Sequence, residues 1–357
     1  MTLHVVHVAS GREWRGGQRQ VWLLARELAR LGDVAQIVVT GRESELAARL
    51  AEDGVPVRAV TWRMGLDPRV VPAVIAALAG DPVVVHAHDA HAVTLGGMAA
   101  RFRGRLLVAT RRVDFPLRRR GFWARATRVI AISEAVAEVL VADGIARERI
   151  TVIHSGVDPA EVRRAARLGI RERLGLPAGT VIVANVAALV PHKDHATLLR
   201  GAAALAGRFP DVHWVVAGAG PERERLERLR AGLGLERRVH LLGQVEEPAR
   251  LIADADCFVM SSKEEGLGTA VLDAMALGIP VASTSAGGLP EMLKGGAGVL
   301  APPHDPEALA DAVARLLLAP DFARETARLA TVAVERFTAR RMAEAVRSVY
   351  RSCVSFP

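Results

Sequence analysis

The segment 261–293, SSKEEGLGTAVLDAMALGIPVASTSAGGLPEML, contains the residue types and spacing that best suit chemistry. Its acids Glu265 and Asp273 stand eight residues apart, the first in a glycine-containing loop and the second in the helix expected to follow. A carboxylate accepts two hydroxyl hydrogen bonds at once, so these acids suit the neighbouring hydroxyls of a sugar and of a ribose. Backbone N–H groups where a glycine loop enters a helix suit a diphosphate. The two acids alone fit a solvated loop glutamate and a helix aspartate favoured by the dipole equally well.

A second polar group ends the apolar run VVVHAH and comprises His86, His88, Asp89 and His91. Imidazole and carboxylate groups can bind metals, but this spacing follows no known zinc motif, and we expect no metal site. Asp254 and Asp256 form a D-x-D, yet they precede an apolar run instead of following a strand. That position is a poor one for holding a metal.

Other nucleotide-binding and nucleophile motifs are missing from the sequence. The run Gly218, Ala219, Gly220 is followed by Pro221 and lacks the third glycine of a dinucleotide fingerprint. There is no GxxxxGK phosphate loop and no nucleophile elbow. The sequence therefore does not predict a nicotinamide enzyme, a P-loop enzyme or a serine hydrolase.

Apolar, β-branched runs alternate with helical stretches along the chain. The strands and helices that they predict must position the candidate site residues. In the first part the runs are LHVVHV, AQIVVT, VPVRAV, VVVHAH, RLLVAT, RVIAIS and ITVIHS, with a helix predicted over 18–31. After a charged stretch at 159–179 they are TVIVANVA, HWVVAG, VHLLG, CFVMSS and IPVAST. Continuous apolar strands are buried on both faces, as in a parallel sheet flanked by helices. We predict an α/β protein with two Rossmann-like, doubly wound parallel-sheet domains facing a cleft, where strand ends bind ligands.

The length of 357 residues also favours two domains. We place the first at 1–160 and the second at 161–335. The tail carries helical runs at 306–318 and 338–351, and we expect the last segment, 336–357, to return to the first domain.

Charge and composition narrow the classes of protein. The balance of 47 basic and 39 acidic residues gives +8, which favours anionic partners such as nucleotide phosphates or an acidic membrane. The arginines are not interleaved with stacking aromatics in a recognisable module, so we expect no nucleic acid partner. With only Cys257 and Cys353, no disulfide framework or cysteine-built metal site is expected. No apolar run reaches the ~18 residues that span a bilayer, and the first residues lack a leader, so we expect a cytoplasmic protein.

The segment 261–293 resembles the donor-binding signature of the family 4 retaining glycosyltransferases of the GT-B fold. That signature is an E-x7-E pair after a serine-ended strand and before a GG-x-PE turn. The matching residues are Ser261, Glu265, Gly266, Gly268, Asp273, Ala274, Met275, Gly278, Pro280, Gly287, Gly288, Pro290 and Glu291. The sequence departs from the pattern at Asp273, which replaces the second glutamate. The resemblance extends over nearly the whole chain and implies an acceptor-side first domain and a donor-side second domain.

The resemblance also implies roles for residues outside this segment. Gly16 and Gly17 match a glycine pair expected to approach the donor phosphates or the acceptor, and His88 matches a histidine that faces the donor sugar. His86 is expected to be a packed strand residue. Lys193 occupies the position of a lysine that clamps the diphosphate, while Ala188 stands where the family has an arginine.

The implied activity is transfer of a sugar, with retention and without a metal or other cofactor, from a nucleotide sugar to an acceptor hydroxyl. We expect Glu265 and His88 to orient the sugar and Asp273 to contact the ribose. The loop of Gly266, Leu267, Gly268 and Thr269 should bind the diphosphate together with Lys193. The base is not identified, and the acceptor is expected to be a glycan or a lipid-linked molecule in glycolipid, lipopolysaccharide or exopolysaccharide assembly. The alternative is a nucleotide-sugar-binding protein of the same fold without transferase activity.

The stretch 101–128 carries ten arginines against the single acid Asp114. They are Arg101, Arg103, Arg105, Arg111, Arg112, Arg118, Arg119, Arg120, Arg125 and Arg128, with Phe102, Phe115, Phe122 and Trp123 among them. Aromatic side chains at a headgroup boundary with arginines on anionic lipid would give peripheral contact with the inner face of the membrane. A solvated charged face, with some arginines holding substrate phosphates, explains the same stretch equally well.

Overall fold

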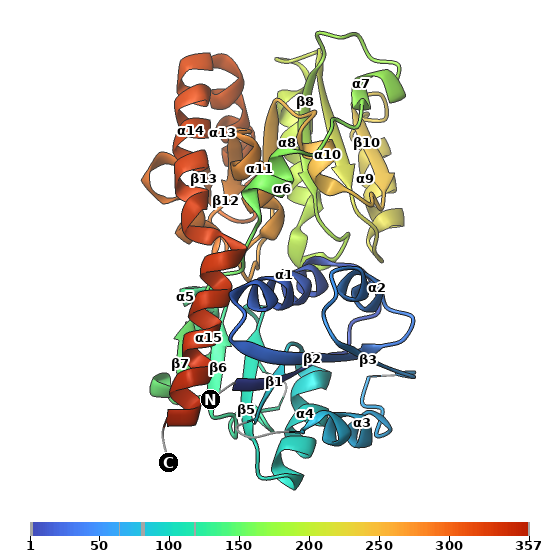
Figure 1. Ribbon diagram of the computed structural model, residues 1–357. Coiled ribbons are helices and arrows are strands. Elements are labelled where there is room, and N and C mark those ends of the chain that lie inside the picture. The colour runs from blue at the N-terminus through green and yellow to red at the C-terminus, as the bar shows by residue number, and fades with distance from the viewer. Residues whose placement is uncertain (1–2, 64, 80–82, 118, 356–357) are drawn as a thin grey trace. The chain divides into compact units, whose positions relative to one another are not determined.

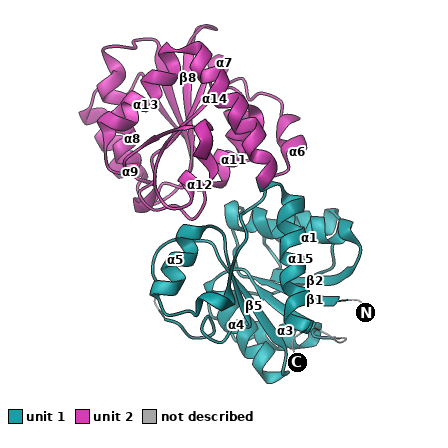
Figure 2. Cartoon of the chain, turned by 90° about the vertical axis from the view of Figure 1, so that its left-hand side faces the viewer, with its two compact units in different colours: residues 1–156, 337–357 teal, residues 157–336 magenta. Residues whose placement is uncertain are grey.

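The chain forms two compact units, which the computed structural model describes over residues 3–63, 65–79, 83–117 and 119–355. Unit 1 comprises residues 1–156 and 337–357, and unit 2 comprises residues 157–336 (Figure 2). The boundary falls between Gly156 and Val157 rather than after residue 160, and the chain enters unit 1 again at Phe337.

Unit 1 is built on a seven-stranded parallel sheet with the order β3-β2-β1-β4-β5-β6-β7. Its strands are β1 Leu3–Ala9, β2 Val34–Gly41, β3 Val57–Val60, β4 Val83–Ala87, β5 Leu106–Arg111, β6 Arg128–Ala131 and β7 Ile150–Val152. Its helices are α1 Gly16–Leu31, α2 Glu45–Glu52, α3 Val70–Ala77, α4 Ala90–Phe102, α5 Glu134–Ala142, the short η1 Arg147–Arg149 and α15 Ala339–Ser355. Crossover helices between parallel strands give the doubly wound arrangement that the sequence predicts.

Unit 2 repeats this design with a six-stranded parallel sheet of order β10-β9-β8-β11-β12-β13. Its strands are β8 Val181–Val186, β9 Val212–Ala217, β10 Val239–Gly243, β11 Cys257–Met260, β12 Val281–Thr284 and β13 Val299–Ala301. Its longer helices are α8 His195–Ala206, α9 Arg223–Gly232, α11 Thr269–Leu277, α13 Pro306–Leu318 and α14 Pro320–Ala333. Its short helices are α6 Pro159–Arg163, α7 Ile170–Arg173, η2 Pro191–Lys193, α10 Pro248–Ile252, α12 Leu289–Leu293 and η3 Lys294–Gly296, and η4 Val334–Phe337 ends at unit 1.

Helix starts divide into capped and open ones. Side chains cap several helices by accepting a hydrogen bond from a backbone N–H of the first turn, among them Ser44, Asp89, Ser133 and Asp305. By contrast, α1 and α11 begin at glycine-rich loops, without a side-chain cap and without an acid in the first turn. Neither helix therefore has an acid in its first turn that would interact with the positive end of its dipole.

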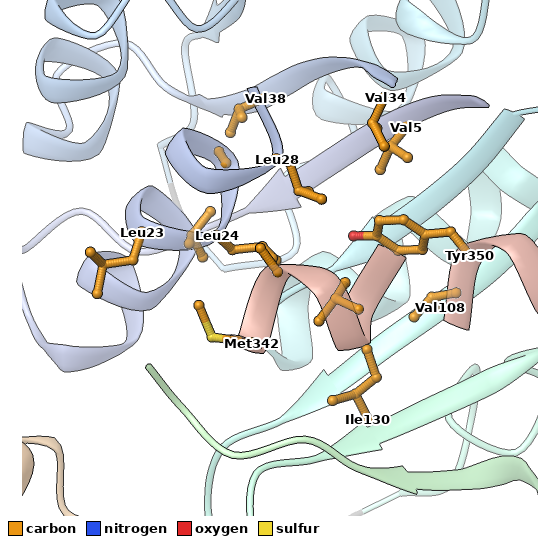
Figure 3. Close-up of a cluster of buried hydrophobic side chains, with 14 of the residues drawn as sticks. Val5, Leu23, Leu24, Leu28, Val34, Val38, Val108, Ile130, Met342 and Tyr350 are labelled. Atoms are coloured by element: carbon orange, nitrogen blue, oxygen red, sulfur yellow. The ribbon is translucent and has the colours of Figure 1, made fainter. Parts of the chain in front are cut away.

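The C-terminal helix completes the core of unit 1. Side chains of α15 join one buried cluster with α1 and the sheet (Figures 1 and 3), and the fully buried Tyr350 lies beside Leu28 and Val108. Arg347 on α15 also pairs with Asp33, which immediately precedes β2, at 3.2 Å. Among the described residues, no helix is both long and apolar enough to cross a membrane.

Leu28→Ala should destabilise unit 1 by about 2–5 kcal/mol, because Leu28 is completely buried and its removal leaves a cavity. Urea unfolding followed by tryptophan fluorescence reports mainly on this unit, which contains Trp14, Trp22, Trp62 and Trp123, while unit 2 contains Trp214. Leu66→Ala is the matched control, since Leu66 is 58% exposed. Equal losses for the two variants would contradict the placement of α1 in the core.

Candidate functional site

The centre of the candidate site in unit 2 is an ion pair between Lys193 and Glu265. Lys193 ends η2 and Glu265 lies in the loop between β11 and α11, so the pair brings together residues 72 positions apart. The two side chains are only 17% and 9% exposed. Ser262 adds a hydrogen bond from its hydroxyl to Glu265 Oε2 at 3.1 Å. The structure therefore brings together two residues that the sequence assigned to the same site from separate motifs.

Hydrogen bonds fix the loop that carries Glu265. The Ser261 hydroxyl donates to the backbone oxygen of Lys193 at 2.9 Å, and the Thr284 hydroxyl donates to that of Ser262 at 2.5 Å. The Gly288 N–H donates to the Glu265 backbone oxygen at 3.0 Å. These bonds tie the loop to η2, β12 and the turn before α12, so the carboxylate is held in place without a ligand.

The open start of α11 borders the ion pair. Gly266 and Leu267 are buried, whereas Thr269, the first residue of α11, is partly exposed. Gly268 has φ +91°, and a Cβ there would meet Leu289 Cδ2 at 2.9 Å and Glu265 Cγ at 3.5 Å. Only glycine fits this close approach and this left-handed backbone. The uncapped helix start and Lys193 together supply positive potential suited to a phosphate group.

Asp273 lies in the second turn of α11 and is 2% exposed. The helix position agrees with the sequence analysis, and the ribose contact stays a prediction. Ala188 follows β8 and offers no charge, and the contact of Lys193 with a diphosphate stays a prediction. Asp254 and Asp256 have structural partners: Asp254 accepts from the Ile170 N–H, and Asp256 pairs with Arg171.

The candidate residues of unit 1 gather at the carboxyl ends of adjacent strands. His88 directly follows β4 and Arg112 directly follows β5, while His7 is near the end of β1. His88 Nε2 lies 2.9 Å from His7 Nδ1, and His88 Nδ1 lies 3.3 Å from Arg112 Nη2. We call this set the His7–His88–Arg112 chain. A Cβ on Gly17, in the first turn of α1, would lie 3.9 Å from Arg112 Cδ, so the glycine pair and His88 share a neighbour.

Burial determines the charge of these groups. It lowers the pKa of His7 to about 4 and is also the main reason why the pKa of His88 lies well below the usual range. Burial lowers the pKa of Arg112 to about 10, while nearby Asp89 raises it. At neutral pH the two imidazoles are therefore neutral and the guanidinium is charged.

His86 is a packed strand residue, as its apolar surroundings in the sequence suggest. It is fully buried, with Nδ1 at 2.5 Å from the Tyr350 hydroxyl and Nε2 at 2.7 Å from the Thr110 hydroxyl. His7, His86 and His88 could each offer a nitrogen to a metal ion. However, both nitrogens of His86 already have hydrogen-bond partners, and Arg112 adds positive charge, so the cluster needs no metal to explain it.

Asp89 and His91 are not part of this cluster. Asp89 accepts from the backbone and hydroxyl of Ser10 and caps α4, and His91 is exposed. Sequence reasoning missed His7, although a signal was present. His7 and His86 occupy corresponding positions in two predicted strands, and the sheet pairs these positions directly.

The arginine-rich stretch is only partly a surface, which corrects the sequence expectation. Trp123 is 5% exposed, and Arg111 is buried with a bond to the Phe115 backbone oxygen. Phe122 packs so closely on α4 that a Cβ on Gly97 would meet its ring at 2.5 Å. Trp123 is therefore buried and not available to a headgroup boundary, whereas Phe122 is partly exposed and packs on α4. Arg118 lies outside the described residues.

The exposed part of this stretch lies at the end of α4 and in the loop between β5 and β6. Phe102 is 75% exposed and Met98, four residues earlier on the same helix, is 46% exposed. The exposed charged residues are Arg101, Arg103, Arg119, Arg120 and Arg125. Phe115 in the loop is 40% exposed.

Two doubly wound parallel sheets, each with polar groups at the carboxyl ends of its strands, define a class of α/β protein in which ligands bind at those strand ends. Residues 14–161 match the family model described as Glycosyltransferase Family 4, and residues 167–331 match the one described as Glycosyl transferases group 1. The chain belongs to the family 4 glycosyltransferases, with the GT-B fold. This confirms the family and fold predicted from the segment 261–293.

Solved structures show the same fold over almost the full chain. Anabaena HepE in complex with UDP-glucose has a TM-score of 0.83 at 22% identity, covering 98% of this chain and 99% of that one. A glycosyltransferase from Rickettsia africae has a TM-score of 0.85 at 18% identity, covering 100% of both chains.

Curated relatives match over shorter regions. The D-inositol 3-phosphate glycosyltransferase of Saccharomonospora viridis is 31% identical over 245 residues, which are 65% of this chain and 57% of the relative. The protein of the same name from Mycolicibacterium paratuberculosis is 39% identical over 181 residues, or 48% of this chain and 40% of the relative. The chain thus spans about half the length of these relatives.

Gly268→Ala should lower the stability of unit 2 by at least about 1 kcal/mol, because alanine is strained at a left-handed backbone and its Cβ would displace Leu289. Thermal unfolding measures this change. Gly232→Ala is the matched control. It ends α9 with no atom near the added Cβ, so it should be neutral or stabilising by up to about 1 kcal/mol. Similar stabilities for both variants would show that the loop before α11 is not constrained as described.

Proposed function

We propose that the protein is a retaining glycosyltransferase that moves a sugar from a nucleotide-sugar donor to an acceptor hydroxyl without a metal ion. The observation that carries the proposal is the partly buried Lys193–Glu265 pair beside the uncapped start of α11. Family membership supports it, as do the transferase names of the curated relatives. The complex of Anabaena HepE with UDP-glucose supports a nucleotide sugar as the donor.

The reaction breaks the bond between an anomeric carbon and a diphosphate, so positive charge develops on the sugar and negative charge on the leaving group. Lys193 and the amides near Gly268 and Thr269 would stabilise the diphosphate. Glu265 would orient the sugar hydroxyls. Hydrogen bonds from Lys193 and Ser262 hold its carboxylate in position. Asp273 would bind the ribose. A donor phosphate oxygen would accept the proton of the acceptor on the same face of the sugar.

The second candidate function is nucleotide-sugar binding without transfer. Ala188 favours this alternative, because it stands where the family has an arginine and so does not provide a cation that would stabilise the leaving group. The two functions differ in one measurement, which is turnover of a donor with any acceptor.

Glu265→Gln should reduce turnover by more than about tenfold, or roughly 1.4 kcal/mol of transition-state stabilisation, because the variant loses the charge that orients the sugar. The assay uses a panel of UDP, GDP, ADP and CMP sugars, with NMR to determine the anomer of the product. Glu264→Gln is the control, since Glu264 is the adjacent residue and its side chain is exposed. Full activity of Glu265→Gln with a verified donor would refute the proposed role, and a product of inverted configuration would refute retention.

We further propose that the acceptor is lipid-linked and that unit 1 meets it at an anionic membrane surface. The exposed Phe102 and Met98 lie among Arg101 and Arg103 at the end of α4. Apolar side chains at the headgroup boundary and arginines on anionic lipid would act together. The inositol phosphate in the names of the curated relatives provides the competing acceptor, which needs no membrane.

The combined variant Arg101→Gln, Phe102→Ser, Arg103→Gln should reduce co-sedimentation with anionic vesicles at low salt by at least about tenfold. Each basic residue near such a surface contributes about 1 kcal/mol. Added salt should weaken wild-type binding, because it screens the arginines.

The control variant carries Arg324→Gln, Arg328→Gln and Val332→Ser on α14, where two exposed arginines and the 62% exposed Val332 form a comparable set. It should bind like the wild type. Equal recovery of wild type and the α4 variant in the supernatant of anionic vesicles would favour the soluble acceptor.

A further inference from the structure

Asp194 and His304 share an uncommon backbone conformation and contact each other. Among the non-glycine residues that the structure describes, these two alone have a positive φ, 44° for Asp194 and 62° for His304. This left-handed region costs energy for a residue with a Cβ, because the Cβ then lies too close to the following carbonyl oxygen. His304 Nδ1 is 2.9 Å from Asp194 Oδ2. The contact therefore joins two strained points of the backbone that are far apart in the sequence.

Asp194 forms the turn between η2 and α8, directly after Lys193. Its N–H donates to the Pro191 backbone oxygen at 3.3 Å and closes η2. Its carboxylate accepts from the Thr197 hydroxyl at 2.8 Å and from the Thr197 N–H at 3.4 Å, and so caps α8. The left-handed turn at Asp194 therefore determines the direction in which the chain leaves Lys193.

His304 is attached to a second helix start beside this turn. It directly precedes Asp305, whose side chain caps α13. Helices α13 and α8 pack closely, since a Cβ on Gly201 would meet the Pro306 backbone oxygen at 3.1 Å. The imidazole is 63% exposed, but its backbone is held by the start of α13 against the start of α8. His304 therefore supports Asp194 from a fixed position.

The contact between the two side chains has a defined direction. A carboxylate only accepts hydrogen bonds, so His304 Nδ1 carries a proton and donates it to Asp194. A contact with an exposed partner contributes little to the stability of a whole domain. We therefore expect its effect in the geometry of the turn and not in the free energy of unfolding.

Lys193 is held on its other side by the loop that carries Glu265. The Ser261 hydroxyl donates to the Lys193 backbone oxygen at 2.9 Å, and the ammonium group of Lys193 pairs with the Glu265 carboxylate. The partners on this side are fixed by the loop. A change of conformation at Asp194 would therefore turn the Lys193 side chain relative to Glu265.

We propose that His304 is a positioning residue for Lys193. It donates a hydrogen bond to Asp194, keeps Asp194 in the left-handed conformation and so directs the Lys193 side chain toward Glu265 and the diphosphate. This role rests on the proposed function, in which Lys193 stabilises the leaving group. His304 acts through Asp194 and needs no contact with the substrate.

Lysine NMR tests the positioning without a donor. The chain has three lysines, Lys193, Lys263 and Lys294, so their ¹³Cε signals can be followed separately, and Lys193→Gln identifies the first by removing it. His304→Ala removes the hydrogen-bond donor and should shift the Lys193 signal, while the Lys294 signal stays in place. His304→Asn should return the Lys193 signal toward its wild-type position, because its amide N–H lies near the position of Nδ1 and asparagine tolerates the left-handed backbone.

Turnover tests whether His304 acts through Lys193. With the donor verified for the Glu265 variant, His304→Ala should reduce kcat by at least about threefold, because a misdirected charge stabilises the leaving group less well. The melting temperature should stay unchanged, and His304→Asn should recover part of the rate. In Lys193→Gln protein, His304→Ala should cause no further loss, because its effect passes through the lysine.

Glu307→Ala is the matched control, at an exposed residue in the first turn of α13. It alters the same helix start and should change neither kcat nor the Lys193 signal. An equal effect of Glu307→Ala and His304→Ala would contradict the proposal, because any disturbance of this helix start would then suffice.

An unchanged Lys193 signal in folded His304→Ala protein would overturn the positioning role. So would an equal loss of kcat from His304→Ala with and without Lys193, because His304 would then act independently of the lysine. Full turnover of Lys193→Gln would refute the proposed role of Lys193 as well. Full turnover of His304→Ala alone would leave that role intact and refute only the positioning.

Discussion

The site in unit 2 depends on the ion pair between Lys193 and Glu265, whose two charged side chains are both largely removed from water. Removing either partner would leave an uncompensated charge in a poorly exposed position, which costs far more than the pair contributes to stability. Ser262 donates a hydrogen bond to the Glu265 carboxylate. The Ser261 and Thr284 hydroxyls donate to the backbone oxygens of Lys193 and Ser262. In the proposed function, this pair would exchange partners with a ligand that carries both hydroxyls and phosphates.

In unit 1, the buried polar groups at the carboxyl end of the sheet include neutral imidazole rings. Burial keeps His7 and His88 uncharged, and the single cation, Arg112, imposes one proton arrangement on both. Each hydrogen bond within this set determines the direction of the next one. The strands that form the sheet thus also position the charged Arg112 side chain at its carboxyl end.

Most elements could be predicted because buried parallel strands and amphipathic helices leave strong patterns. The helix at 306–318 was predicted at its observed bounds. The strand β13 was missed because three residues contain too little periodicity. The helix α14 was missed because its buried face consists of Thr326 and the alanines 327, 330 and 333, which give weak hydrophobic contrast.

The sequence by itself determined the two-domain α/β fold, the family and the motif residues Lys193 and Glu265, because local patterns and fixed spacings carry that information. Only the tertiary structure decided the partners. His7 and His88 are 81 residues apart, and His88 and Arg112 are 24 apart, so their contact follows from strand order. It also decided that Trp123 packs inward while Phe102 faces solvent. Composition could not separate these aromatics, because burial depends on which surfaces the finished fold brings together.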